Sequence, residues 1–218
     1  MNRPGTPINI HHNTVSPPLL NSPELQLRFL NPGDLPEVKR LCKEWFPIEY
    51  PDKWWVSPMF RPQKDLSNSN SFSEMSYWKE NLDFEFFLLS RYLDITSTHK
   101  FYSVAAIYRG QIVGMVVAEI KDADSLPKED SEILASSFRT SRSRIGYILS
   151  LGVVKELRKQ GIASFLLENL IAHLTSPDHF DVKGVYLHVL TTNMAAITFY
   201  EHRGFRPHLF LPYYYAIG

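Results

Sequence analysis

Several separate stretches of the chain either alternate apolar and polar residues or form short apolar runs, and both patterns predict β-strands. The expected strands span 25–30, 103–108, 111–120, 145–154, 184–190 and 205–211. Arg109 and Gly110 stand between the second and third of these strands, where a glycine favours a tight turn. We therefore expect those two strands to form a hairpin.

Three other stretches carry apolar residues at helical spacing, and they predict helices over 34–45, 161–174 and 194–203. Asn193 is a favourable N-cap for the last helix, and Gly204 fits its C-terminal end. The polar stretch 121–143 is expected to be a loop. Strands and helices in this order predict an α/β (α+β) fold, in which helices flank one mixed central sheet.

Length and composition indicate one globular domain. A chain of 218 residues can bury a substantial core. Residues 1–24 are rich in Pro, Asn and Ser, so we expect a disordered tail followed by a domain over 25–218. The formal net charge is zero, which gives no indication of nucleic-acid binding. The one cysteine, Cys42, is expected to be a buried apolar residue, and a chain with one cysteine suits the cytoplasm.

No apolar run approaches the ~18–20 residues that a membrane span requires, and no secretory signal pattern opens the chain. We therefore expect no membrane anchor in this chain. His11 and His12 are not followed by further ligands at metal spacing, so we expect no metal.

A basic, glycine-bearing turn, 158–163, connects the strand at 145–154 to the helix at 161–174. Backbone N–H groups at a helix start have no partner within the helix, and the helix dipole adds positive charge, so such a turn can bind an anion. Gly161 would let a bulky anion approach the backbone. On the six residues alone, an ordinary helix start with solvated basic side chains explains the pattern equally well.

The order of these elements resembles the GNAT superfamily of N-acetyltransferases from about Leu25 to the C-terminus. A strand, the turn at 158–163, a helix, the strand at 184–190 and a short helix capped by Asn193 follow one another as they do there. Four segments, at 45–52, 147–154, 186–193 and 211–215, narrow the resemblance to the protein N-terminal acetyltransferases of this superfamily.

The resemblance implies acetyl transfer from acetyl-CoA to N-terminal amines of proteins, with Met followed by an apolar or amphipathic residue as the expected acceptor. Acetylation of histone lysines is the alternative. It also implies a location on the cytosolic face of the Golgi membrane through a C-terminal tail that this chain lacks. The implied cofactor-binding residues are Leu149, Ser150, Leu151, Arg158, Lys159, Gln160, Gly161, Ile162, Ala163, Asn193 and Tyr200.

The same resemblance implies that Tyr147 and His188 are the catalytic pair, acting through ordered water. A histidine has a suitable ordinary pKa, ~6.5, for a base near pH 7. Tyr147 is the better candidate for holding water or relaying a proton. A backbone N–H near Leu151 and Gly152 is the expected oxyanion donor, at a glycine-tolerated bulge. Tyr200 is the candidate for protonating the leaving thiolate. For each of the three aromatic side chains, plain core packing is the alternative.

Two loops are expected to flank the acceptor peptide. One follows the first helix and contributes Phe46, Pro47, Glu49 and Tyr50, with Glu49 orienting the ammonium; the other contributes Tyr214 and Tyr215. Aromatic residues there give an apolar wall with hydroxyl groups that can hold a peptide backbone, although they would also fit a plain surface beside a proline turn.

The chain departs from the superfamily pattern at two places. Residues from about 55 to 90 are expected to form an insertion, and the last strand of the family is expected to be missing. A different class of protein is therefore the alternative: a catalytically impaired isoform that binds CoA.

Overall fold

The structure, a computed structural model, describes residues 19, 22–45, 90–97, 100–139 and 142–212. Five strands form one sheet in the order of the sequence. Neighbouring strands are antiparallel, except that the last strand runs parallel to the fourth. The mixed sheet is therefore confirmed. The strands are β1 (Leu25–Phe29), β2 (Tyr102–Tyr108), β3 (Gln111–Asp122), β4 (Arg144–Val153) and β5 (Val182–Tyr186).

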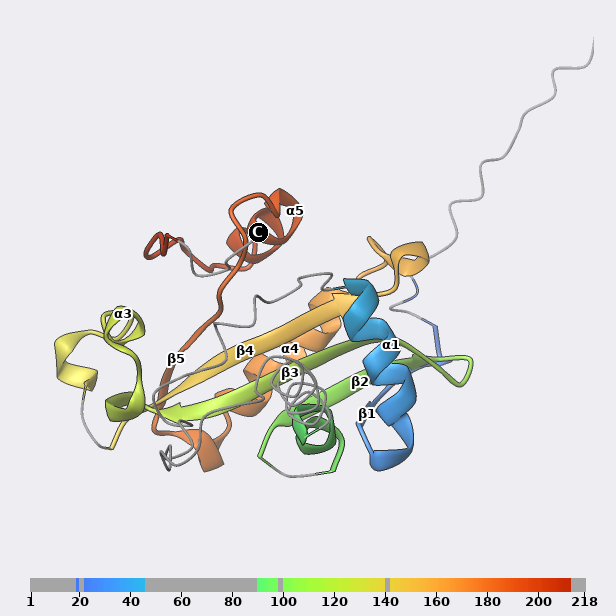
Figure 1. The fold of residues 1–218 in the computed structure, drawn as a ribbon, viewed down its shortest axis with the longest axis horizontal. Helices are drawn as coiled ribbons and strands as arrows, with labels where there is room; N and C mark the ends of the chain where they lie inside the picture. The colour runs from blue at the N-terminus through green and yellow to red at the C-terminus, as the bar shows by residue number, and fades with distance from the viewer. Residues whose placement is uncertain (1–18, 20–21, 46–89, 98–99, 140–141, 213–218) are drawn as a thin grey trace, which may run out of the picture.

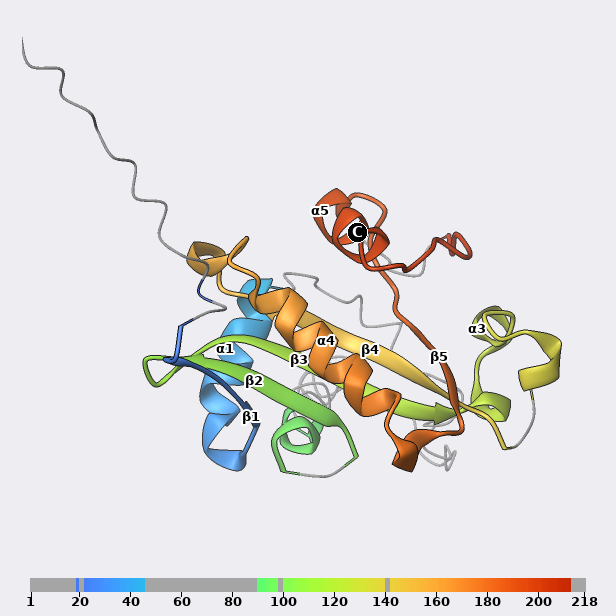
Figure 2. The same ribbon diagram turned by 180° about the vertical axis from the view of Figure 1, so that it is seen from behind.

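Helices cover both faces of the sheet (Figures 1 and 2). Helix α1 lies on one face and α4 on the opposite face, whereas α5 lies beyond the end of β5, joined to it by an irregular segment. Residues 90–97, which were not predicted as a helix, are also helical. The labelled helices are α1 (Leu35–Trp45), α3 (Lys128–Ser131), α4 (Ile162–Leu174) and α5 (Met194–Glu201).

Local sequence explains where these elements begin and turn. The Asn31 side chain accepts a hydrogen bond from the Gly33 N–H at 2.9 Å and so caps the short turn that leads into α1. Arg109 and Gly110 connect β2 and β3 with φ values of 51° and 77°. Two successive residues with positive φ are what a type I′ hairpin turn requires, so the predicted hairpin is confirmed.

The core has a layer on each side of the sheet. Leu166 and Leu170 of α4 are fully buried against one face, and Val38 and Leu41 of α1 are fully buried against the other. Each fully buried side chain of this size stabilises the fold by roughly 1.5–3 kcal/mol through removal of apolar surface from water. The α4 layer extends to the end of β5 and so holds the strand that leads into the candidate site.

Three sequence predictions are corrected by the structure. The strand predicted at 184–190 ends at Tyr186, because its pairing with β4 ends there. Residues 205–211 form no strand, since no described strand lies beside them, and a strand without a partner has no ladder to stabilise it. The stretch 121–143, expected to be a loop, contains α3 and short 3₁₀ turns.

The N-terminal tail predicted at 1–24 lies almost entirely outside the described residues. Of its described part, Leu19 packs against the α4 layer, and Glu24 pairs with Arg109 at 3.1 Å. Most of the insertion predicted at about 55–90 also lies outside the described residues.

Candidate active site

The parallel strands β4 and β5 separate along their length. They are paired from Arg144 with Val182 to Tyr147 with Tyr186, and no pair follows. Strand β4 continues to Val153, whereas the chain after Tyr186 leaves the sheet. A fork therefore opens beside Tyr147.

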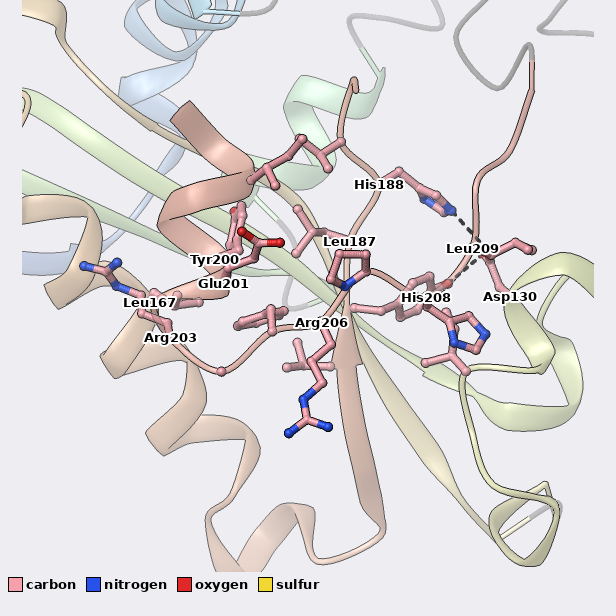
Figure 3. A pocket seen from close by; sticks show the side chains of 18 of the residues that line it. Asp130, Leu167, Leu187, His188, Tyr200, Glu201, Arg203, Arg206, His208 and Leu209 are labelled. Atoms are coloured by element: carbon pink, nitrogen blue, oxygen red, sulfur yellow. Dashed lines mark hydrogen bonds and ion pairs between the residues drawn. The ribbon is translucent and has the colours of Figure 1, made fainter. Parts of the chain in front are cut away.

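Four polar side chains meet at the base of this fork. His188 Nδ1 lies 3.2 Å from the Tyr147 hydroxyl, and His188 Nε2 lies 3.1 Å from Asp130 Oδ1. The Tyr186 hydroxyl donates to Asp130 Oδ2 at 3.0 Å. Figure 3 shows His188 pointing from the chain after β5 toward Asp130 of α3. The two predicted catalytic residues are thus in contact, and a buried carboxylate contacts His188 on its other ring nitrogen.

These contacts indicate how the imidazole is oriented. A carboxylate can only accept hydrogen bonds, so Asp130 fixes the proton of His188 on Nε2. The lone pair on Nδ1 then faces the hydroxyl of Tyr147, which can donate to it. Burial lowers the pKa of His188 below its ordinary value, Asp130 opposes this shift, and the charge of Lys121 reinforces it. An imidazole that is neutral near pH 7 can accept a proton.

Asp130 is the functional candidate that the sequence reasoning missed. It lies in the stretch that polarity predicted to be a loop, and its carboxylate is buried although nothing in the sequence marks it as such. The available signal was weak: Pro127 followed by acidic residues is typical of a helix start. Contact between residues so far apart in sequence follows only from the fold.

The turn at 158–163 has the backbone of an anion site. Gly161 is the N-cap of α4 with φ 86°, and Lys159 also has positive φ, at 61°. Alternating backbone conformations of this kind turn successive N–H groups toward one concave side, where anions bind. Arg158 Nε donates to the Val153 carbonyl at 3.0 Å, which holds this side chain against the end of β4. Ile162 is buried in the core, so only its backbone can contribute.

A β-bulge lies on β4, but not where the sequence placed it. Val117 pairs with Ser150 and Ala118 with Ile148, so Leu149 is the extra residue. The expectation of a bulge near Leu151 and Gly152 is corrected accordingly. Gly152 has another role: a Cβ added there would lie 2.0 Å from the Trp45 ring, so the glycine allows this ring to pack on the β4 backbone.

The last two predicted cofactor residues lie on α5. The Asn193 side chain accepts a hydrogen bond from the Ala196 N–H at 3.2 Å, as expected of an N-cap. Tyr200 is buried beside Phe199 and Phe205, with ring centroids 5.1 and 5.2 Å away. Burial raises the pKa of its hydroxyl. The Tyr200 ring therefore packs in the core, as the alternative interpretation expected. The role of its hydroxyl as the proton donor to the leaving thiolate stays a prediction.

A large cavity of about 1340 Å³ lies beside this site. Its wall combines α4, the chain after β5, α5 and residues 205–211, and it includes Asp130, His188 and Tyr200. None of the residues 158–163 lines it. The cavity therefore adjoins His188 without including the turn at 158–163.

The acceptor residues that the sequence predicted, Phe46, Pro47, Glu49, Tyr50, Tyr214 and Tyr215, lie outside the described residues. Within the described part of the chain, no three His, Cys, Asp or Glu side chains converge as metal ligands would. Among those same residues, no helix has the length and apolar character to cross a membrane.

A forked parallel strand pair, a bulge on the inner strand and a glycine-capped helix at the mouth of the fork define the GNAT class of acyltransferase folds. The sequence profile described as the acetyltransferase (GNAT) family matches residues 44–205. The chain belongs to that family.

Curated relatives and solved structures resemble the chain over most of its length. It is 49% identical over 191 residues to N-alpha-acetyltransferase 60 of Xenopus tropicalis, covering 88% of this chain and 63% of the relative. It is 40% identical over 221 residues to N-alpha-acetyltransferase 60 of Drosophila melanogaster, covering 92% and 66%. The chain thus spans slightly less than two thirds of these relatives.

Two solved structures from Arabidopsis thaliana share the fold. The first is NAA60 in complex with acetyl-CoA, which is 24% identical with a TM-score of 0.58 and 84% of each chain covered. The second is Naa50 in complex with the bisubstrate analogue CoA-Ac-MVNAL. It is 21% identical with a TM-score of 0.50, and 88% of this chain and 89% of that chain are covered.

Proposed function

We propose that this chain transfers an acetyl group from acetyl-CoA to the N-terminal amine of a protein or peptide. The single observation that carries the proposal is the contact of Tyr147 with His188 at the fork between β4 and β5. The family and the activity named in its curated relatives, N-alpha-acetyltransferase 60, support it.

The turn at 158–163 binds the pyrophosphate of acetyl-CoA in this proposal. The N–H groups at the start of α4 and the positive φ values of Lys159 and Gly161 provide the concave backbone that a phosphate needs. Arg158 and Lys159 add positive charge. The pantetheine arm then runs along Leu149, Ser150 and Leu151, past the point where β5 leaves the sheet.

Tyr147 and His188 remove a proton from the acceptor amine. The amine gives its proton, through water, to the Tyr147 oxygen, while the Tyr147 hydroxyl proton passes to Nδ1 of His188. An N-terminal amine has an ordinary pKa of about 7.7–8.0, so a base that is neutral near pH 7 is sufficient.

The free amine attacks the thioester carbon, and the new N–C bond forms. As the C–S bond breaks, the nitrogen gives its second proton to water, so that a neutral amide results and this water can return a proton to the donor that protonates the thiolate. The backbone at the Leu149 bulge stabilises the oxyanion, because the extra residue of a bulge is outside the regular ladder. The thiolate leaves and takes a proton, for which the Tyr200 hydroxyl is the candidate donor.

The acceptor we propose begins with Met followed by an apolar or amphipathic residue. The structure of Arabidopsis Naa50 with CoA-Ac-MVNAL, an analogue whose peptide part begins Met-Val, supports this choice. A cytosolic location belongs to the same proposal and is supported by the single cysteine in the chain.

CoA release with Met-Leu and Met-Lys peptides, each beside the same peptide with a blocked N-terminus, tests the proposal. We expect turnover only on the free N-termini. Equal turnover on a blocked Met-Lys peptide would favour lysine acetylation. Binding of acetyl-CoA with turnover on neither peptide would favour a chain that binds CoA without catalysis.

A further inference from the structure

Lys121 places a positive charge over the ring of Tyr147. Its ammonium lies 4.3 Å from the ring centroid. The position follows from the sheet: Glu119 of β3 pairs with Tyr147 of β4, so Lys121, two residues further along, projects from the same face and reaches the ring diagonally. The Lys121 side chain is 27% exposed, and its ammonium also lies 4.0 Å from Glu119 Oε2.

His188 therefore has opposite charges on its two sides. On the Nε2 side, the Asp130 carboxylate lies 3.1 Å away and favours the protonated ring. On the Nδ1 side, Tyr147 separates the ring from Lys121, and this positive charge disfavours the protonated ring. The other ionisable groups that face this region are Tyr186, Glu119, Glu129 and His208, the last two from the wall of the cavity.

We propose that Lys121 is a positioning residue of this site, which holds the Tyr147 ring against His188 and balances Asp130 so that the imidazole stays unprotonated. The inference rests on the proposed function for its catalytic consequence. The Asp130 carboxylate favours the protonated ring, whereas burial and the charge of Lys121 both favour the neutral one. A cation over the face of an aromatic ring orients that ring, and it stabilises negative charge on the Tyr147 oxygen while the proton passes to Nδ1.

Variants at Lys121 test this balance through the pH dependence of kcat/KM. Lys121→Met keeps most of the apolar stem and removes the charge, so the acidic limb should move to higher pH by about half a unit or more. Lys121→Arg keeps a cation over the ring and should leave the limb in place. Asp130→Asn should move the limb to lower pH, and the double variant should lie between the two single variants.

A matched control is present in the same chain. The ammonium of Lys100 lies 5.4 Å from the centroid of the Phe101 ring. Lys100→Met removes a comparable cation–ring contact that does not adjoin His188. It should leave the acidic limb and kcat where they are in the unchanged chain.

NMR titration of the His188 ring in the whole chain, assigned by its disappearance in His188→Gln, measures the same quantity without turnover. A His188 pKa that rises in Lys121→Met and not in Lys121→Arg supports the proposal. An unchanged His188 pKa in folded Lys121→Met overturns it, and Lys121→Gln replaces that variant if Lys121→Met does not fold. A risen pKa in a chain that acetylates no peptide would preserve the role of Lys121 and reject the proposed function.

Discussion

The hydroxyl of Tyr147 lies 3.2 Å from Nδ1 of His188, at the last point where β4 and β5 are paired. Strand β4 and the segment directly after β5 hold these side chains together where the sheet opens. A cosubstrate that enters the fork meets the pair at its base, whereas the anion-binding turn lies at its mouth. The geometry thus separates the residues expected to bind the cosubstrate from those expected to move the proton.

This separation predicts that Tyr147→Phe and His188→Gln affect the chemical step. Each should lower kcat by about 10²–10⁴-fold, the usual contribution of a positioned acid or base, with acetyl-CoA affinity changed by no more than a few-fold. Because both residues act on one proton path, the double variant should lose less than the product of the single losses. Steady-state kinetics and calorimetric titration of acetyl-CoA measure the two quantities. A folded His188→Gln chain with normal kcat would show that the histidine only packs.

Gly161→Val should weaken acetyl-CoA binding strongly. Gly161 has φ 86°, a conformation that a β-branched residue adopts only with strain, and its side chain would stand where a phosphate must approach the amides. Gly110 also has positive φ, at 77°, with open space around it, so Gly110→Val imposes similar strain at the hairpin. The control should lose stability but keep its affinity for acetyl-CoA. Equal affinity in both variants would remove the turn from the cosubstrate site.

Most of the fold could be predicted from the sequence because the patterns were local. The continuous apolar run in β3 and the helical spacing in α4 each mark an element that is buried in the fold. The end of β5 could not be predicted in this way. Residues 187–190 continue the alternation of a strand, but a strand also needs a neighbour, and β4 has diverged by then. Strand length was thus decided by tertiary pairing, which sequence periodicity does not encode.

The residues of the candidate site also divide into those that local sequence motifs predicted and those that only the fold brings to the site. His188 and Tyr147 were predicted because their motifs resemble a family, and the structure brings them into contact. Asp130 and Lys121 were missed, since each acts through long-range contacts from segments with no recognisable motif. The bulge was predicted near Gly152 because glycine tolerates the backbone conformation of a bulge. It lies at Leu149 instead, because the pairing register between β3 and β4 decides its position.

Gly152→Ala should destabilise the chain although Gly152 lies outside the proton path. An added Cβ would come within 2.0 Å of the Trp45 ring, so the ring or β4 must move. Overpacking of this kind typically costs about 1–3 kcal/mol. Gly184→Ala is the control, because its nearest neighbour would be 3.7 Å from the new Cβ. Urea unfolding of both variants measures the difference, and equal midpoints would show that Trp45 does not depend on the glycine.

His173 should make the stability of the chain fall with acidification. Its Nε2 lies 3.2 Å from Nε2 of His179, and its ring stacks on Tyr102 with centroids 4.4 Å apart. Burial and the charge of His179 lower the pKa of His173, while Asp178 opposes the shift. The folded state therefore prefers the neutral ring. This contribution is fully present above the unfolded pKa of about 6.5 and is lost as the pH falls through that value toward the lower folded pKa.

His173→Gln removes this titration and keeps a side chain that can hydrogen-bond to His179. Urea unfolding between pH 7.5 and pH 5 should therefore show a flatter decline in the free energy of unfolding than in the unchanged chain. His208→Gln, at an exposed histidine on the segment after α5, serves as the control and should keep the original decline. The same slope in His173→Gln as in the unchanged chain would mean that the acid sensitivity comes from other groups.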